Sequence, residues 1–201
     1  MSQLSQIDFS NPATIIGIVV VVALIAVVIA VIVNLEKRKS GRLRSRFGEE
    51  YDLVLQETGS RRKADAVLES RIQRVEHLKI RDLTVVERDR YLAQWQDVQA
   101  RFIDHPRGAV TEADELVGSV LIARGFPTSA FDQRAADISV HHAELVGPYR
   151  NASLIASRAG KNEATTEELR SALIQYRSLF DSMLGASVPV ERAQVERRKF
   201  A

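Results

Sequence analysis

Two adjacent histidines, His141 and His142, lie in the stretch FDQRAADISVHHAEL of a chain that has only four histidines. Imidazole and carboxylate groups held close together are the usual means of proton transfer and of metal binding. Neighbouring residues on a helix point about 100° apart, whereas the zinc-binding helix motif places its histidines four residues apart. The spacing therefore favours a short connection in which Asp137 or Ser139 caps a helix and one histidine faces water. A metal or acid–base role is the alternative.

Catalysis would require the fold to gather side chains from distant parts of the chain. The candidates for such a pocket are two aromatic and four polar residues: Trp95, Phe102, His105, Arg134, Asp137 and His141. Three or more of these polar groups around one concave pocket would favour an enzyme, whereas scattered positions and an open apolar patch would favour a docking protein. The sequence contains no serine-hydrolase, zinc-protease or kinase motif, so it predicts no catalytic, cofactor-binding or metal-binding residue.

Three cations, Arg61, Arg62 and Lys63, open a predicted helix in the stretch TGSRRKADAV. The N–H groups of a first helical turn prefer negative charge, so this placement is unfavourable without an anionic partner. The alternatives are exposure to solvent or pairing within the domain, contact with lipid or another protein, and a phosphate bound at the helix start. No glycine-rich phosphate loop surrounds the triplet, which makes it only a weak candidate for an anion site.

The elements that must position these side chains begin with an apolar segment, residues 14–33. It reads TIIGIVVVVALIAVVIAVIV and contains no charged side chain. A helix of this length rises about 30 Å, which is the thickness of the hydrocarbon core of a bilayer. A cleaved signal peptide would carry a positive N-terminal region, whereas the short segment 1–13 has Asp8 as its one charged side chain. We therefore expect a retained transmembrane helix.

A basic collar, residues 34–46, follows the apolar segment. Its six cations are Lys37, Arg38, Lys39, Arg42, Arg44 and Arg46. No basic side chain precedes the segment, so the positive-inside rule places the chain after it in the cytoplasm and the N-terminus outside. The same cations are candidates for contact with anionic lipid headgroups, each contributing about 1 kcal/mol near the surface. The predicted location is the cell membrane, with a single span and a cytoplasmic C-terminal domain.

The distribution of charge argues against nucleic acid as a partner. The chain has 28 basic and 26 acidic side chains. Without the six collar cations, and without Asp8 and Glu36, residues 47–201 retain 22 basic and 24 acidic side chains. A protein that neutralises the phosphates of a duplex carries its positive charge on the folded domain, whereas this domain is slightly acidic. The lack of cysteine also removes disulfides and thiolate metal sites.

Apolar residues recur at helical spacing through residues 47–184, and no β alternation of useful length occurs. The predicted fold class is therefore all-α, with one N-terminal transmembrane helix followed by a soluble bundle of about six or seven helices. Two capping-box signatures, Thr84 with Glu87 and Thr165 with Glu168, mark the starts of two of them.

Breaks in the pattern predict where the helices end. The first soluble helix is expected to continue from the collar and to end near Gly59, with Leu43, Phe47, Tyr51 and Leu55 on its apolar face. Gly147 and Pro148 are expected to kink or divide a later helix. Residues 185–201 are polar and predict a flexible tail.

Several blocks of the chain resemble a family of uncharacterised bacterial proteins that are short, single-pass and helical. The blocks are RFGEEYDLVLQETGSRRKADAVLESR, IRDLTVVERDRYLAQWQDVQARFIDHPRGAVTEADELV, RGFP, FDQRAADISV and ATTEELRSALIQYRSLFDSML. They cover most of residues 46–184, and QWQDVQARFIDHP and FDQRAADIS are the most specific. The resemblance implies a bacterial membrane setting and carries over no reaction, cofactor or catalytic residue.

The sequence favours a membrane-anchored helical interaction or scaffold protein at the inner face of a bacterial membrane. Its expected partners are the lipid bilayer and a protein of unknown identity. Small residues near one face of the anchor, Ala23, Ala26 and Ala30, add self-association as a further hypothesis. The alternative function is a membrane-tethered enzyme of unknown reaction, with a pocket near Trp95, His105, Asp137 and His141.

Overall fold

The computed structural model describes residues 12–185 of the chain. The predicted N-terminal segment 1–13 and tail 185–201 lie almost wholly outside this range. Within it the chain forms eight helices and no strand, which confirms the all-α prediction; seven of the eight follow the apolar helix. The chain divides into two compact units, Met1–Ser45 and Arg46–Ala201.

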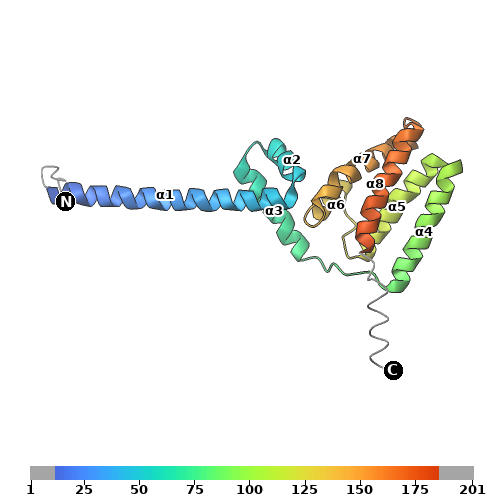
Figure 1. The fold of residues 1–201 in the computed structure, drawn as a ribbon, viewed down its shortest axis with the longest axis horizontal. Helices are drawn as coiled ribbons and strands as arrows, with labels where there is room; N and C mark the ends of the chain where they lie inside the picture. Colours follow the sequence, from blue (N-terminus) through green and yellow to red (C-terminus); the bar gives the residue numbers. More distant parts are fainter. Residues whose placement is uncertain (1–11, 186–201) are drawn as a thin grey trace, which may run out of the picture. The chain divides into compact units, whose positions relative to one another are not determined.

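Helix α1, Pro12–Phe47, runs without a break through both the apolar segment and the basic collar (Figure 1). Its 36 residues rise about 54 Å. The bulky side chains described between Val19 and Val33 are exposed, as are the six collar cations. Burying one such valine or isoleucine is worth about 1.5–3 kcal/mol. Among the described residues, α1 is the one helix long and apolar enough to cross a membrane.

A glycine separates α1 from α2, Glu49–Thr58. The prediction of one helix from the collar to Gly59 is therefore wrong, because Gly48 has a φ of 52°, which a right-handed helix does not accommodate. The end of the helix at Gly59 was predicted correctly, and this glycine adopts the left-handed conformation common at helix C-termini. The break rotates the buried face of α2 toward Val54 and leaves Leu55 only partly buried.

The remaining helices are α3, Arg61–Glu76; α4, Val85–Asp104; α5, Pro106–Ala123; α6, Phe131–Ile138; α7, Ala143–Gly160; and α8, Thr166–Leu184. Both predicted capping boxes are present. The Thr84 hydroxyl accepts from the Glu87 N–H at 3.2 Å, and the Thr165 hydroxyl accepts from the Glu168 N–H at 3.3 Å. Each such cap stabilises its helix by about 1 kcal/mol.

Helix α7 continues through Gly147 and Pro148 as one element, so these residues do not divide it. Pro148 lies in the second turn, where its missing N–H removes one hydrogen bond close to the helix N-terminus. The helix is held by its neighbours, because Val146 and Tyr149 on either side of the pair are buried in the core.

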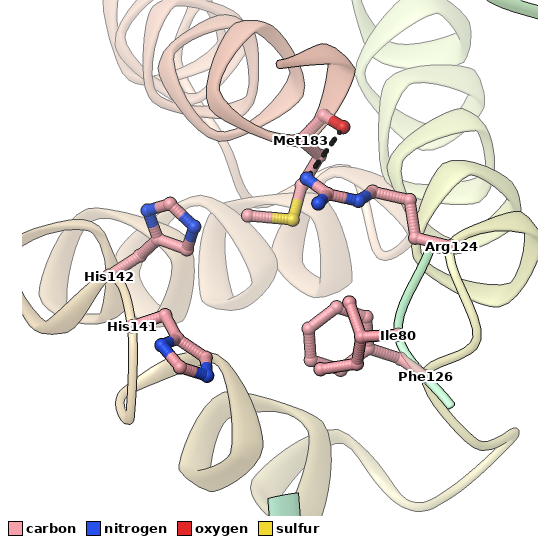
Figure 2. A pocket seen from close by; sticks show the side chains of 6 residues that line it. All are labelled: Ile80, Arg124, Phe126, His141, His142 and Met183. Atoms are coloured by element: carbon pink, nitrogen blue, oxygen red, sulfur yellow. Dashed lines mark hydrogen bonds between the residues drawn. The ribbon is translucent and has the colours of Figure 1, made fainter. Parts of the chain in front are cut away.

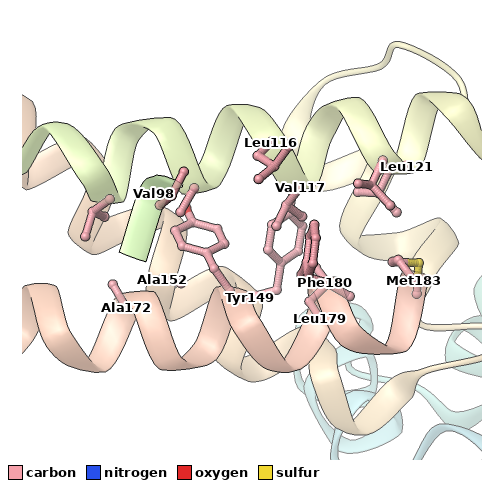
Figure 3. Close-up of a cluster of buried hydrophobic side chains, with 14 of the residues drawn as sticks. Val98, Leu116, Val117, Leu121, Tyr149, Ala152, Ala172, Leu179, Phe180 and Met183 are labelled. Atoms are coloured by element: carbon pink, nitrogen blue, oxygen red, sulfur yellow. The ribbon is translucent and has the colours of Figure 1, made fainter. Parts of the chain in front are cut away.

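The main core lies between α4, α5, α7 and α8 and is built around aromatic rings (Figure 3). Trp95 stacks on Phe180 with ring centroids 4.7 Å apart, and Tyr149 meets Tyr176 edge-on at 6.3 Å. The Tyr176 hydroxyl donates to Asp114 Oδ1 at 2.9 Å, which gives the buried ring a polar partner. Trp95, Tyr149, Tyr176 and Phe180 are at most 1% exposed, so rings from α4, α7 and α8 form the centre of this core.

Candidate functional site

A tight turn after α5 carries Arg124 and Phe126, which line one side of a pocket. The chain leaves α5 through Arg124, Gly125 and Phe126, and Gly125 has a φ of 99°. An added Cβ at Gly125 would lie 2.3 Å from the carbonyl oxygen of Lys79, so only glycine permits this close approach of two backbones. The Arg81 N–H donates to the Arg124 carbonyl at 2.8 Å and holds the extended segment before α4 against the turn.

Arg124 joins the turn to the end of α8. Its Nη1 donates to the carbonyl of Met183 at 3.0 Å, and its Nε donates to the carbonyl of Arg81 at 3.2 Å. Its Nη2 lies 3.3 Å from Asp82 Oδ1, but the Asp82 side chain is 95% exposed and therefore weakens the Arg124 charge little. The Arg124 side chain itself is only 15% exposed.

The second side of the pocket is the connection between α6 and α7, which carries His141 and His142. The N–H groups of both histidines donate to the carbonyl of Ile138, at 3.2 and 2.9 Å, so the connection is a compact turn. The His142 Nδ1 lies 3.0 Å from the Ser182 hydroxyl on α8. His141 is exposed, as the sequence predicted for one of the pair.

The two sides enclose a pocket of about 330 Å³ lined by Ile80, Arg124, Phe126, His141, His142 and Met183. Figure 2 shows the two imidazoles on one side, Ile80 and Phe126 opposite them, and Arg124 beside Met183. The pocket thus combines an apolar wall with three groups that are cationic or can become so. Such a mixture suits a ligand that has both an apolar body and an acidic group.

Burial lowers the pKa of His141 below its ordinary value, and the positive charges of Arg46 and Arg124 lower it further. Burial also lowers the pKa of His142; the carboxylate of Glu144 opposes this effect, while His141 and Arg124 add to it. Because an unperturbed histidine titrates near pH 6.5, both rings are mostly neutral at pH 7. The pocket therefore contains one fixed positive charge, that of Arg124, beside two imidazoles.

A buried carboxylate that the sequence reasoning missed holds the first helices of this unit to the rest. Glu50 on α2 is 3% exposed and accepts from Arg71 on α3 at 2.7 Å. Arg150 on α7 donates hydrogen bonds to both oxygens of the same carboxylate, at 2.5 and 2.9 Å. Burial alone raises the pKa of Glu50, but the hydrogen bonds and charges of Arg150 and Arg71 outweigh burial and lower it.

A second ion pair joins α3 to α6. Arg74 donates to Asp137 Oδ1 at 2.9 Å, and Gln133 donates to the same oxygen at 2.8 Å. Asp137 is fully buried, and its Oδ2 has no hydrogen-bond partner among the described residues. Of the two predicted caps, Ser139 occupies the C-cap position of α6, and its hydroxyl donates to the carbonyl of Ala136 at 2.6 Å. Asp137 does not cap α7, whose N-cap is His142, but is paired with Arg74.

The sequence carried a signal for Glu50. Phe47, Glu50 and Val54 are three and four residues apart, which places the acid in line with two apolar residues that are buried. A charged side chain in such a line predicts a buried partner. Neither Arg71 nor Arg150 stands out in the sequence, since the pairing spans 21 and 100 residues.

The structure does not bring the candidate enzyme residues together. Trp95 is packed in the core against Phe180, and Asp137 is paired with Arg74. His105 lies at the α4–α5 corner beside a separate hollow of about 560 Å³, while His141 lies at the other pocket. Neither pocket contains three of the residues predicted from sequence. Within residues 12–185 no group of three or more histidine, aspartate or glutamate side chains is arranged to hold a metal ion.

Two further residues of the predicted enzyme pocket, Phe102 and Arg134, and the predicted anion site at Arg61 to Lys63 remain to be placed. Phe102 is partly buried against the core, and Arg134 lies beside Gly118 with its Nε buried and without a hydrogen-bond partner among the described residues. The triplet Arg61 to Lys63 lies exposed in the first turn of α3, and Ser60 does not cap this turn with its side chain. Its role as an anion site stays a prediction.

Arg46, the last cation of the collar, belongs to the folded unit. Its Nε donates to the carbonyl of Val140 at 3.1 Å, next to the histidine pair. Comparison with known proteins gives no further assignment, because no protein-family model, curated protein or solved structure matches this chain.

Proposed function

We propose that this chain is a single-pass protein of a bacterial cell membrane whose α2–α8 domain lies in the cytoplasm and docks a protein partner. The observation that carries the proposal is α1, one unbroken helix that passes from an exposed, charge-free segment into six exposed cations. The apolar side chains described between Val19 and Val33 are exposed, and the 20-residue apolar segment to which they belong is long enough to span the hydrocarbon core of a bilayer.

The basic collar supports both the orientation and a contact with the inner leaflet. Six cations directly after a span retain that end of the helix in the cytoplasm. Five of them, Lys37 to Arg44, belong to the first unit, whereas Arg46 belongs to the folded unit and donates to the carbonyl of Val140. Anionic headgroups would add about 1 kcal/mol for each cation held near the surface. The bacterial setting follows from the resemblance of the sequence blocks.

The absence of native cysteine permits a direct test of this topology. Single cysteines are introduced at Ser5, before the span, and at Ser70, which is exposed on α3. In intact bacterial spheroplasts, a membrane-impermeant maleimide is expected to label Ser5→Cys and to spare Ser70→Cys until the membrane is permeabilised. The cysteine-free chain is the control. Labelling of Ser70→Cys in intact cells would refute the cytoplasmic domain.

Exposed apolar side chains on α7 and α8 are the preferred surface for the partner. Leu154 on α7 and Ile174 on α8 are each 61% exposed. The two helices pack together, and Asn151 and Gln175 hydrogen-bond across them at 3.0 Å. Apolar groups exposed on adjoining helices suit a helix or loop of another protein, which would bury them on binding.

Site-specific photo-crosslinking in living cells tests this surface. A benzophenone amino acid at position 154 or 174 is expected to form an adduct of the same mass from both positions. The matched control is position 97, because Asp97 is exposed and lies on a different helix, α4. The double substitution Leu154→Arg with Ile174→Arg is expected to reduce adduct formation at a third site, Ser178, at least tenfold. Equal adducts at position 97, or none at 154 and 174, would exclude this docking surface.

A further inference from the structure

We propose that the pocket lined by Arg124, His141 and His142 binds a small organic carboxylate, with its acidic group on these three side chains and its apolar body on Ile80 and Phe126. This inference concerns a ligand site inside the domain and is independent of the docking surface on α7 and α8.

Arg124 supplies the fixed charge. Its hydrogen bonds within the described residues use three of its five N–H groups, to Met183, Arg81 and Asp82. The other two remain for a ligand, and the 15% exposure of the side chain limits the competition from water. Burial of this kind makes an arginine–carboxylate contact stronger than one at an open surface.

The other charges around the pocket favour an anion. Arg46 reaches the carbonyl of Val140, directly before the histidines, and lowers the pKa of His141. The two acids that face this region are Asp82, paired with Arg124, and Glu144, whose carboxylate lies 4.0 Å from His142 Nδ1. Both acids are well exposed, at 95% and 71%, so solvent screens them more than it screens Arg124.

The apolar wall and the size of the pocket select the ligand class. Ile80, Phe126 and Met183 offer no charged group, and a bare phosphate would leave them in contact with water. The volume of about 330 Å³ is at the lower end for a small-molecule site. A short aromatic or aliphatic acid fits both the apolar wall and the small volume. The ligand would be either a soluble aromatic acid, represented by 3-phenylpropionate, or a fatty acid, represented by octanoate.

Binding of such an anion must take up protons. A carboxylate next to His141 and His142 favours their charged forms and therefore raises their pKa values. By linkage, the affinity for the carboxylate is expected to increase as the pH falls through the range in which the free histidines titrate, below about 6.5. The ligand stays ionised over most of this range because a carboxylic acid titrates near pH 4–5.

The test follows the histidine rings of the full chain in lipid nanodiscs by NMR, with ¹³C at the ring ε1 position. Saturating 3-phenylpropionate or octanoate is expected to raise the pKa of His141 and His142 by at least about half a unit. His105 is the internal control, since α5 separates it from Arg124 by 18 residues of helix. The neutral analogue 3-phenylpropan-1-ol is expected to leave the pKa values of all rings unchanged. The acid that binds more tightly shows whether the ligand is a soluble aromatic acid or a fatty acid.

Arg124→Gln removes the positive charge but keeps a long polar side chain in the pocket. It is expected to weaken carboxylate binding at least tenfold. If this variant does not fold, His141→Gln with His142→Gln replaces it, read by calorimetry with 3-phenylpropionate, and the same loss is expected. The proposal is overturned if neither acid shifts the two rings at 10 mM, about the weakest binding of interest. Equal binding of the alcohol, or of inorganic phosphate, would also overturn it.

Discussion

Glu50→Ala is expected to destabilise the α2–α8 domain by about 3–5 kcal/mol, because it leaves Arg71 and Arg150 without the buried carboxylate that both contact. The loss of both contacts also frees α2 from α7. Trp95, the one tryptophan, is buried and stacked on Phe180, so its fluorescence reports denaturant-induced unfolding of the full chain in detergent.

The matched control is Glu49→Ala, which removes an exposed acid from the same helical turn. It is expected to change the free energy of unfolding by less than about 1 kcal/mol. Equal effects of the two substitutions would mean that the Glu50 contacts contribute no more than an acid at a helix N-terminus. Glu50→Gln is expected to lie between them, since the amide oxygen still accepts from an arginine.

The same contact predicts an acid dependence of stability. The pKa of Glu50 is lower in the folded protein than in the unfolded chain. Its contribution is therefore fully present above the unfolded pKa, near 4.3, and is lost as the pH falls through the lower folded value. Glu87 and Glu168 act in the same direction, because their hydrogen bonds lower each pKa to about 2. Glu50→Gln is expected to flatten the stability profile between these pH values.

Gly125→Ala is expected to produce the second large loss, about 2–4 kcal/mol. The new Cβ would lie 2.3 Å from the carbonyl oxygen of Lys79, and the φ of 99° is strained for any residue with a side chain. The Lys79 backbone cannot move away freely, since the Arg81 N–H is bonded to the Arg124 carbonyl. Thermal unfolding measures the loss.

Gly108→Ala serves as the control for Gly125→Ala. Gly108 lies in α5, and an added Cβ meets no atom within 4 Å. This substitution is expected to stabilise the domain by about 0.5–1 kcal/mol, because alanine loses less backbone entropy than glycine in a helix. A Gly125→Ala variant as stable as the native chain would show that the turn and the segment before α4 adjust at little cost.

Local sequence features predicted most of the helices. Thr84 with Glu87 and Thr165 with Glu168 are contacts within one helical turn, and both were found where the sequence placed them. In α4, which the first of these caps opens, Tyr91, Trp95 and Val98 are buried and Phe102 is partly buried. The break at Gly48 was missed because the apolar spacing continues across it, and spacing alone does not report the sign of φ.

The pocket was less predictable than the helices. His141 and His142 were recognised as unusual residues, but Arg124, which lines the same pocket, follows the end of α5, and Ser182, which contacts His142, lies on α8. Asp137 was one of two candidates for a helix cap, because nothing near it in the sequence indicates that Arg74 lies against it. Contacts over 40 or more residues depend on how the helices pack, which a single sequence does not specify.

The two partners of Glu50 are synthesised at different times, so its contacts form in sequence during translation. Arg71 follows Glu50 by 21 residues, so these two can meet soon after synthesis, whereas Arg150 follows by 100. Until Arg150 of α7 has been made, the carboxylate of Glu50 lacks the partner that contacts both of its oxygens, and α2 packs against α3 without α7. The full set of Glu50 contacts therefore depends on the more distant half of the polypeptide, and a chain terminated before residue 150 is expected to be more open to proteases at α2.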